Sequence, residues 1–159
     1  MIFKEEINED TSPKEYCSWE EVELLTRIVA QKIRVSNKRY DIILGITNGG
    51  IIPSRLVARE LDINHIQFIP VRNKKLHTEE MPLFYKNKKY LIIDEIYDTG
   101  ETFSKVCNAL KIFDCDFAFL MSRYPYTGKP SAFIGRLLNH NKWIVFPWEM
   151  KSNQHHIEN

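Results

Sequence analysis

The residues best suited to chemistry lie in one short segment, residues 91–102. An apolar run ends there in two adjacent carboxylates, Asp94 and Glu95. Such a carboxylate pair can accept hydrogen bonds from the vicinal hydroxyls of a sugar. The stretch that follows combines a glycine and two hydroxyls with the free N–H groups of a helix start, which can hold a phosphate. Its members are Asp98, Thr99, Gly100, Glu101 and Thr102. The segment therefore predicts a site that binds both ends of a sugar phosphate.

The acidic pair also predicts a divalent cation. Two carboxylates would repel a diphosphate held beside them, so a hard cation such as Mg²⁺ is needed, with Asp94 and Glu95 as its ligands. An alternative is that Asp98 and Glu101 only cap a helix, since D-x-x-E resembles a capping box. That alternative does not explain why an acidic pair directly follows an apolar strand, and we therefore favour a functional site.

A second turn suited to an anion follows the apolar run at 41–46. Its residues are Thr47, Asn48, Gly49 and Gly50. Adjacent glycines let backbone amides close around an anionic group, and the helix that follows adds its dipole. A tight connection between a strand and a helix produces the same pattern, so this turn is weak evidence when taken alone.

The elements that would carry both turns alternate between strands and helices. A capping pattern at Ser18 and Glu21 with an apolar stripe predicts a helix over 19–34, and Pro53 suits the first turn of a helix ending at Leu61. We expect a third helix over 99–113, strands over 41–46, 65–71, 88–94, 117–122 and 142–146, a turn over 95–98, and a long loop over 72–89. This alternation predicts an α/β fold: a single domain with a mostly parallel sheet flanked by helices. Both turns then fall beyond the carboxyl ends of strands, where such sheets bind ligands.

Composition limits the partners and the location. The 159 residues include 22 basic and 21 acidic side chains, and this near-neutral charge gives no indication of a nucleic-acid partner. Three widely spaced cysteines lack zinc-binding spacing and are expected as reduced thiols of a cytoplasmic protein. The N-terminus lacks the apolar run of a signal peptide, and no transmembrane segment is expected. We expect one domain over 1–159, with flexible ends at 1–15 and 152–159 and a mobile loop at 72–87.

Segment 91–102 resembles the donor-binding signature of the type I phosphoribosyltransferases: an apolar strand, two acidic residues, two variable residues, then D-T-G-x-T. The turn at 47–50 is similar to the family's pyrophosphate loop, although Asn48 stands where relatives are usually basic. The resemblance implies that the two motifs bind phosphoribosyl diphosphate with Mg²⁺. It also implies that Asp98 is the catalytic partner of the purine imidazole, and that the fold carries a small C-terminal hood.

The C-terminal run KWIVFPWEMK over 142–151 narrows this resemblance. Bacterial xanthine-guanine phosphoribosyltransferases carry a similar W-x-x-x-P-W-acid run, in which the first Trp stacks on the purine. The resemblance assigns base contacts to Trp143, to backbone carbonyls near Ile144, and to Arg123, which stands where relatives carry a Lys that donates to the 6-oxo group. Because arginine can only donate, we expect 6-oxopurines to be accepted and adenine rejected. The alternative for Arg123 is a surface residue at a strand end.

The implied activity is transfer of the 5-phosphoribosyl group from phosphoribosyl diphosphate to guanine, xanthine or hypoxanthine, in purine salvage, by a homo-oligomer (a dimer or tetramer). Two alternatives stay open. The first is the same reaction with another base, such as orotate, uracil or adenine. The second is a non-catalytic regulator that senses phosphoribosyl diphosphate, which would need a basic face for a nucleic acid.

Overall fold

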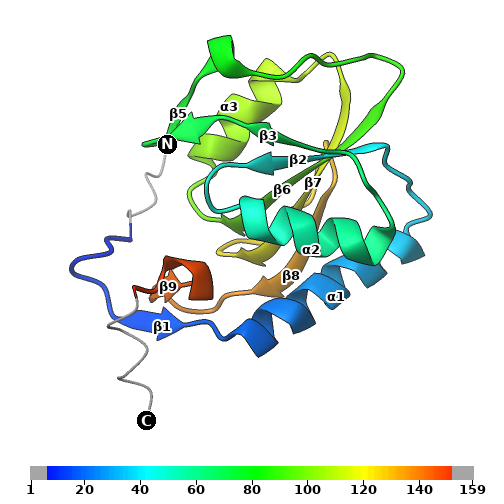
Figure 1. Ribbon diagram of the computed structural model, residues 1–159. Helices are drawn as coiled ribbons and strands as arrows, with labels where there is room; N and C mark the ends of the chain where they lie inside the picture. Colours follow the sequence, from blue (N-terminus) through cyan, green and yellow to red (C-terminus); the bar gives the residue numbers. More distant parts are fainter. Residues whose placement is uncertain (1–6, 152–159) are drawn as a thin grey trace.

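A parallel sheet of five strands forms the centre of the protein (Figure 1). The computed structural model describes residues 7–151. Its elements in chain order are β1 (Lys14–Tyr16), α1 (Trp19–Val35), β2 (Ile42–Ile46), α2 (Ile51–Leu61), β3 (Ile66–Ile69), β4 (Val71–Arg72), β5 (Lys75–Leu76), the 3₁₀ turn η1 (Thr78–Glu80), β6 (Lys89–Tyr97), α3 (Glu101–Ala109), β7 (Asp114–Ser122), β8 (Ala132–Leu137), β9 (Trp143–Val145) and the 3₁₀ turn η2 (Pro147–Glu149). The sheet has the order β3-β2-β6-β7-β8, and all four pairings are parallel.

Helices cover both faces of the sheet, which confirms the predicted α/β fold. Helices α1 and α2 lie on one face and α3 lies on the other (Figure 1). Along β6, Leu91 and Ile93 pack toward α1 and α2, whereas Tyr90 and Ile92 pack toward α3. Successive side chains of a strand point to opposite faces. The continuous apolar run of β6 is therefore buried from both sides, as in other parallel sheets.

Helix α1 begins where the sequence predicted. The hydroxyl of Ser18 accepts a hydrogen bond from the backbone N–H of Glu21 at 3.1 Å, which satisfies one free donor of the first turn. The carboxylate of Glu21 pairs instead with Arg136 on β8, at 2.6 Å. The predicted cap is thus confirmed from the Ser18 side, while the Glu21 side chain connects the helix to the sheet.

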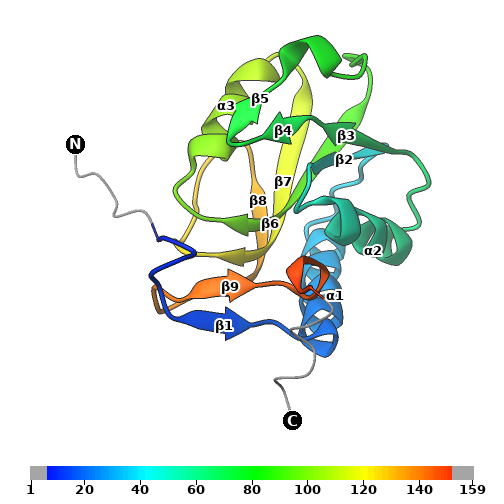
Figure 2. The ribbon, with the colours of Figure 1, turned by 60° about the vertical axis from the view of Figure 1, so that its left-hand side comes forward.

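A second small sheet, which we call the hood, comes from both ends of the chain. Strand β1 pairs with β9 in parallel, with Lys14 opposite Trp143 and Tyr16 opposite Val145 (Figure 2). We expected a C-terminal hood and a flexible end over 1–15, but Lys14 and Glu15 lie in this strand. The boundary of the flexible end was placed too late, because this three-residue strand is stabilised by β9, a partner distant in sequence. Residues 1–6 and 152–159 lie outside the described part.

Other boundaries also differ from the predicted ones. Strand β6 continues to Tyr97, so the turn expected over 95–98 is wrong, and α3 is shorter than predicted at both ends. Strand β8 was not predicted. The loop expected over 72–89 contains part of a β4–β5 hairpin, whose two-residue turn has Asn73 and Lys74 at positive φ. That geometry is the usual one for a tight hairpin, but the sequence lacks the glycine that normally signals it.

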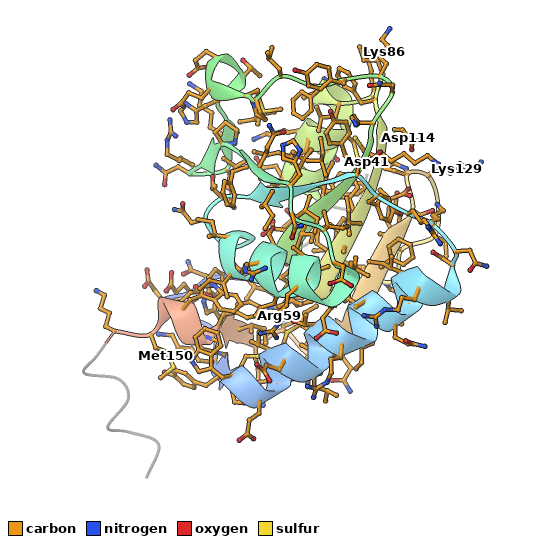
Figure 3. All side chains as sticks on the ribbon, turned by 45° about the vertical axis from the view of Figure 1, so that its right-hand side comes forward. Asp41, Arg59, Lys86, Asp114, Lys129 and Met150 are labelled. Carbon is orange, nitrogen blue, oxygen red and sulfur yellow. The ribbon has the colours of Figure 1, made fainter. Side chains whose placement is uncertain are left out.

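Three labelled residues mark the two ends of the sheet. Asp41 and Asp114, close to the amino ends of β2 and β7, lie together at one end, whereas Met150 lies at the other, beside the hood (Figure 3). Within the described residues, no helix combines the length and apolar character required to span a bilayer. All three cysteines are free thiols.

Candidate functional site

A cavity of about 470 Å³ lies at the carboxyl ends of β2, β6 and β7. It brings together most of the residues predicted from segment 91–102, along with one from the C-terminal run: Asp94, Asp98, Thr99, Gly100, Glu101, Thr102 and Trp143. A cavity of this size suits a nucleotide-sized ligand. Ligands of α/β proteins generally bind at the carboxyl edge of the parallel sheet.

One end of the cavity is the start of α3. Gly100, directly before the helix, has φ +86°, and a Cβ at this position would lie 2.8 Å from the hydroxyl oxygen of Tyr97. The Thr99 hydroxyl accepts a hydrogen bond from the Glu101 N–H at 3.3 Å, and the Glu101 carboxylate pairs with Lys105 at 3.1 Å. The N-terminus of α3 and the two threonines beside it therefore line the cavity, and a helix N-terminus is where proteins commonly bind phosphate.

The two adjacent carboxylates point in different directions because β6 continues through them. Asp94 lines the cavity, and its Oδ1 accepts a hydrogen bond from the Glu95 N–H at 2.8 Å. Glu95 faces away from it: its Oε2 accepts from the indole N–H of Trp148 at 3.0 Å. A Cβ on Gly49 would lie 2.5 Å from the Glu95 carboxyl carbon, so this glycine leaves the space that the Glu95 side chain occupies.

Burial raises the pKa of both carboxyl groups, so each resists ionising unless a cation lies beside it. This burial raises the pKa of Asp94 to about 7, against an ordinary value of 3.8. The pKa of Glu95 is raised first by burial and then by the charges of Asp94 and Glu149, while the Trp148 hydrogen bond lowers it. A divalent cation would relieve this cost, because a nearby positive charge favours the ionised form. Asp94 faces the cavity and can serve a cation there, whereas Glu95 is turned toward Trp148.

The turn at 47–50 lies beside this carboxylate pair. The Thr47 hydroxyl donates toward Ile69 O at 3.1 Å and accepts from the Val71 N–H at 3.2 Å, so it fastens the turn to the neighbouring strands. The Thr47–Asn48 peptide bond is cis, and the Asn48 side chain is exposed. Gly49 lies against the side chain of Glu95, as described above. Within the described part of the chain, residues 47–50 are not among those lining the cavity.

The predicted base-binding residues occupy three different environments. Trp143 is half-buried and lines the cavity, and its indole N–H is buried without a hydrogen-bond partner among the described residues. Ile144 is buried within β9, opposite Glu15 of β1. Arg123 is only 8% exposed, so its alternative assignment as a surface residue is wrong. Its guanidinium donates to two backbone carbonyls, at His140 and Lys142, at 3.1 and 2.6 Å.

Sequence reasoning missed several residues that line the cavity. Tyr97 and Phe103 form an aromatic wall, with ring centroids 5.3 Å apart. Lys74, which the sequence suggested as a possible contact to the diphosphate, lines the cavity from the tip of the β4–β5 hairpin, and its backbone carbonyl accepts a hydrogen bond from Lys105 at 2.6 Å. Residues 7–9 also line it. Aromatic side chains flanking an acidic motif were a usable signal for the wall, whereas the charged N-terminal segment carried none.

A second acidic group lies on η1. His77, Glu79 and Glu80 are close enough together to share a cation. Arg72 already pairs with Glu80, at 2.5 Å, and all three acceptors belong to one short turn. This group is therefore explained by a local ion pair.

Comparison with known proteins agrees with this geometry. The phosphoribosyl transferase domain model matches residues 14–155. The xanthine-guanine phosphoribosyltransferase of Idiomarina loihiensis is 28% identical, with 90% of each chain covered. The crystal structure of a purine phosphoribosyltransferase from Pyrococcus horikoshii is 30% identical, with a TM-score of 0.67 over 87% of this chain and 95% of that one.

A hypothetical protein from Neisseria gonorrhoeae, solved with bound ppGpp, has a TM-score of 0.74 at 20% identity, over 92% of this chain and 95% of that one, and this likeness concerns the fold alone. The domain match extends over most of the sequence, and the Pyrococcus enzyme is similar in both sequence and structure. The chain therefore belongs to the phosphoribosyl transferase domain family.

Proposed function

We propose that this protein transfers the 5-phosphoribosyl group from phosphoribosyl diphosphate to a 6-oxopurine (guanine, xanthine or hypoxanthine), releasing diphosphate, as a step of purine salvage. The observation that carries this proposal is the single cavity that holds a helix-start phosphate site, a carboxylate and an indole. The names of the relatives from Idiomarina and Pyrococcus support the same substrate class.

The arrangement suggests a role for each residue. The amides and hydroxyls of 99–102 would hold the 5-phosphate, and Asp94 would accept hydrogen bonds from the ribose hydroxyls. Trp143 would stack on the purine, and the carbonyls near Ile144 would face its edge. The bond from the anomeric carbon to diphosphate breaks, a bond to the purine nitrogen forms, and Asp98 takes the proton that this nitrogen loses. Positioning and charge stabilisation then account for most of the catalysis.

Asp94 would hold Mg²⁺ in the cavity, and Glu95 would join it as a second ligand only by leaving the indole of Trp148. When bound, the ion would neutralise the negative charge of the departing diphosphate. The backbone amides of the turn at 47–50 would donate hydrogen bonds to the diphosphate. The side chain of Asn48 could add a hydrogen bond there but no positive charge. We also propose a cytoplasmic location, where the three thiols would stay reduced, and assembly as a homo-oligomer.

Measurement of diphosphate release with the donor, Mg²⁺ and a panel of bases tests this proposal. We expect release with guanine, xanthine or hypoxanthine, and rates lower by orders of magnitude with adenine, orotate and uracil. Asp98→Asn should keep donor binding and lose turnover by about a hundredfold or more, the usual contribution of a general base. Absence of release with every base, together with tight donor binding, would favour a sensing regulator over an enzyme.

A further inference from the structure

Arg123 holds the turn that precedes the base-stacking indole. It directly follows β7, and its Nη1 and Nη2 donate to the carbonyls of His140 and Lys142. Both carbonyls belong to the connection between β8 and β9, immediately before Trp143. A guanidinium presents its donors in a rigid fork, so it can satisfy two carbonyls at once. Arg123 therefore helps to fix the position of Trp143, together with the pairing of β9 with β1.

The third nitrogen of the same guanidinium, Nε, lies close to the proposed catalytic carboxylate. Nε of Arg123 is buried without a hydrogen-bond partner among the described residues, and it lies 3.6 Å from Oδ1 of Asp98. The backbone N–H of Arg123 also donates to the carbonyl of Tyr97, the residue before Asp98, at 2.9 Å. Buried donors are rarely left unpaired. A small rotation of Asp98 would complete the contact.

We propose, on the basis of the proposed function, that Arg123 is a positioning residue that links the base-stacking turn to Asp98. This role replaces the direct donation to the base's 6-oxo group that the sequence suggested. Each terminal nitrogen donates to a carbonyl of the connection between β8 and β9, and Nε lies 3.6 Å from Oδ1 of Asp98. In this role Arg123 does not touch the substrates, and it affects the reaction by fixing the positions of Trp143 and Asp98.

Substitution by lysine separates the two roles. Direct donation to a 6-oxo group needs only one N–H. If that were the role of Arg123, the lysine of Arg123→Lys could perform it. A single ammonium on a flexible stem lacks the fork needed to hold two carbonyls and Asp98 together. The positioning role therefore predicts that Arg123→Lys fails.

Arg136 provides a matched control. It is a half-buried arginine on β8 that pairs with Glu21 at 2.6 Å and with Glu15 of the hood at 3.5 Å. It therefore connects the hood to the body of the protein, as Arg123 does, but through surface carboxylates. Arg136→Lys alters a comparable connection and leaves in place both hydrogen bonds from Arg123 to the turn before Trp143.

The experiment compares the steady-state kinetics of Arg123→Lys, Arg123→Met and Arg136→Lys. We expect both Arg123 variants to raise the KM for guanine about tenfold or more, as expected for loss of hydrogen bonds made by a charged group, and to lower kcat. The KM for the donor and the ratio of guanine to adenine rates should stay within about twofold of the wild type. Wild-type kinetics in Arg123→Lys, or a narrower guanine–adenine gap in Arg123→Met, would overturn the proposal.

Hydrogen exchange in the full chain without ligands tests the same idea independently of activity. Amides of residues 139–144 should exchange faster in both Arg123 variants than in the wild type or in Arg136→Lys. Unchanged exchange in this segment would overturn the positioning role. If the wild type releases no diphosphate with any base, the proposed function fails, while the exchange result still decides what Arg123 does.

Discussion

Asp94 shows how a residue suited to binding a cation can weaken the fold that carries it. Its surroundings raise its pKa from 3.8 to about 7, so the folded protein resists ionising it. A carboxyl group that ionises more readily in the unfolded chain makes unfolding easier as the pH rises between these two values. The site thus carries a stability cost at neutral pH that a bound cation would remove.

Replacing Asp94 should therefore stabilise the protein without ligand. In EDTA, Asp94→Asn and the wild type should have similar stability near pH 4, and the variant should gain as the pH rises to about 7, with no further gain above it. The gain amounts to several kcal/mol at most, since one pKa unit corresponds to about 1.4 kcal/mol. Urea unfolding at pH 4, 5.5, 7 and 8.5 would measure it. A difference that is the same at every pH would show that the burial cost is misassigned.

At the scale of elements, the start of α3 determines where a phosphate can bind. The chain enters this helix through Gly100 in the left-handed region, and the aromatic wall leaves a Cβ little room there. The sequence predicted the motif but placed the helix start too early, because D-x-x-E also reads as a cap. The left-handed conformation of Gly100 delays the helix to Glu101, so that Asp98 and Thr99 both lie in the connection that lines the cavity.

Gly100→Ala should abolish donor binding, and Gly128→Ala provides the matched control. Both glycines have positive φ, so each alanine should cost about 1 kcal/mol of stability. A Cβ on Gly128 would lie 3.7 Å from the hydroxyl of Tyr126, an ordinary contact, whereas one on Gly100 would lie 2.8 Å from the hydroxyl of Tyr97 and would displace this wall of the cavity. Isothermal titration with phosphoribosyl diphosphate and Mg²⁺ would measure both. Normal binding by Gly100→Ala would mean that the phosphate site lies elsewhere.

At the scale of the whole molecule, the cavity lies between the sheet and a hood made from both chain ends. Trp143 comes from β9, which pairs with β1, while Asp94 and Asp98 come from the central strand and the residue beyond it. A ligand that contacts both parts stabilises the folded state as a unit. We therefore expect donor binding to appear as a change in global stability.

Phosphoribosyl diphosphate at about a hundred times its Kd should raise the Tm by about 5–10 °C in the presence of Mg²⁺. In EDTA the shift should nearly vanish, because no cation would then bridge Asp94 and the diphosphate. Asp94→Asn should lose most of the difference between the two conditions. Differential scanning fluorimetry provides the measurement, and equal shifts with and without the metal would contradict a bridging cation.

The sequence by itself determined the layered α/β fold and the two turns at the sheet edge, because apolar periodicity and local turn chemistry are properties of neighbouring residues. It also predicted Asp94, Asp98 and Trp143, which the structure brings to one cavity. Only the tertiary structure decided that β1 completes the hood, that Glu95 faces Trp148, and that Arg123 donates to the backbone of the connection between β8 and β9. These contacts join residues far apart in the chain, and no local pattern encodes which distant group a buried side chain will meet.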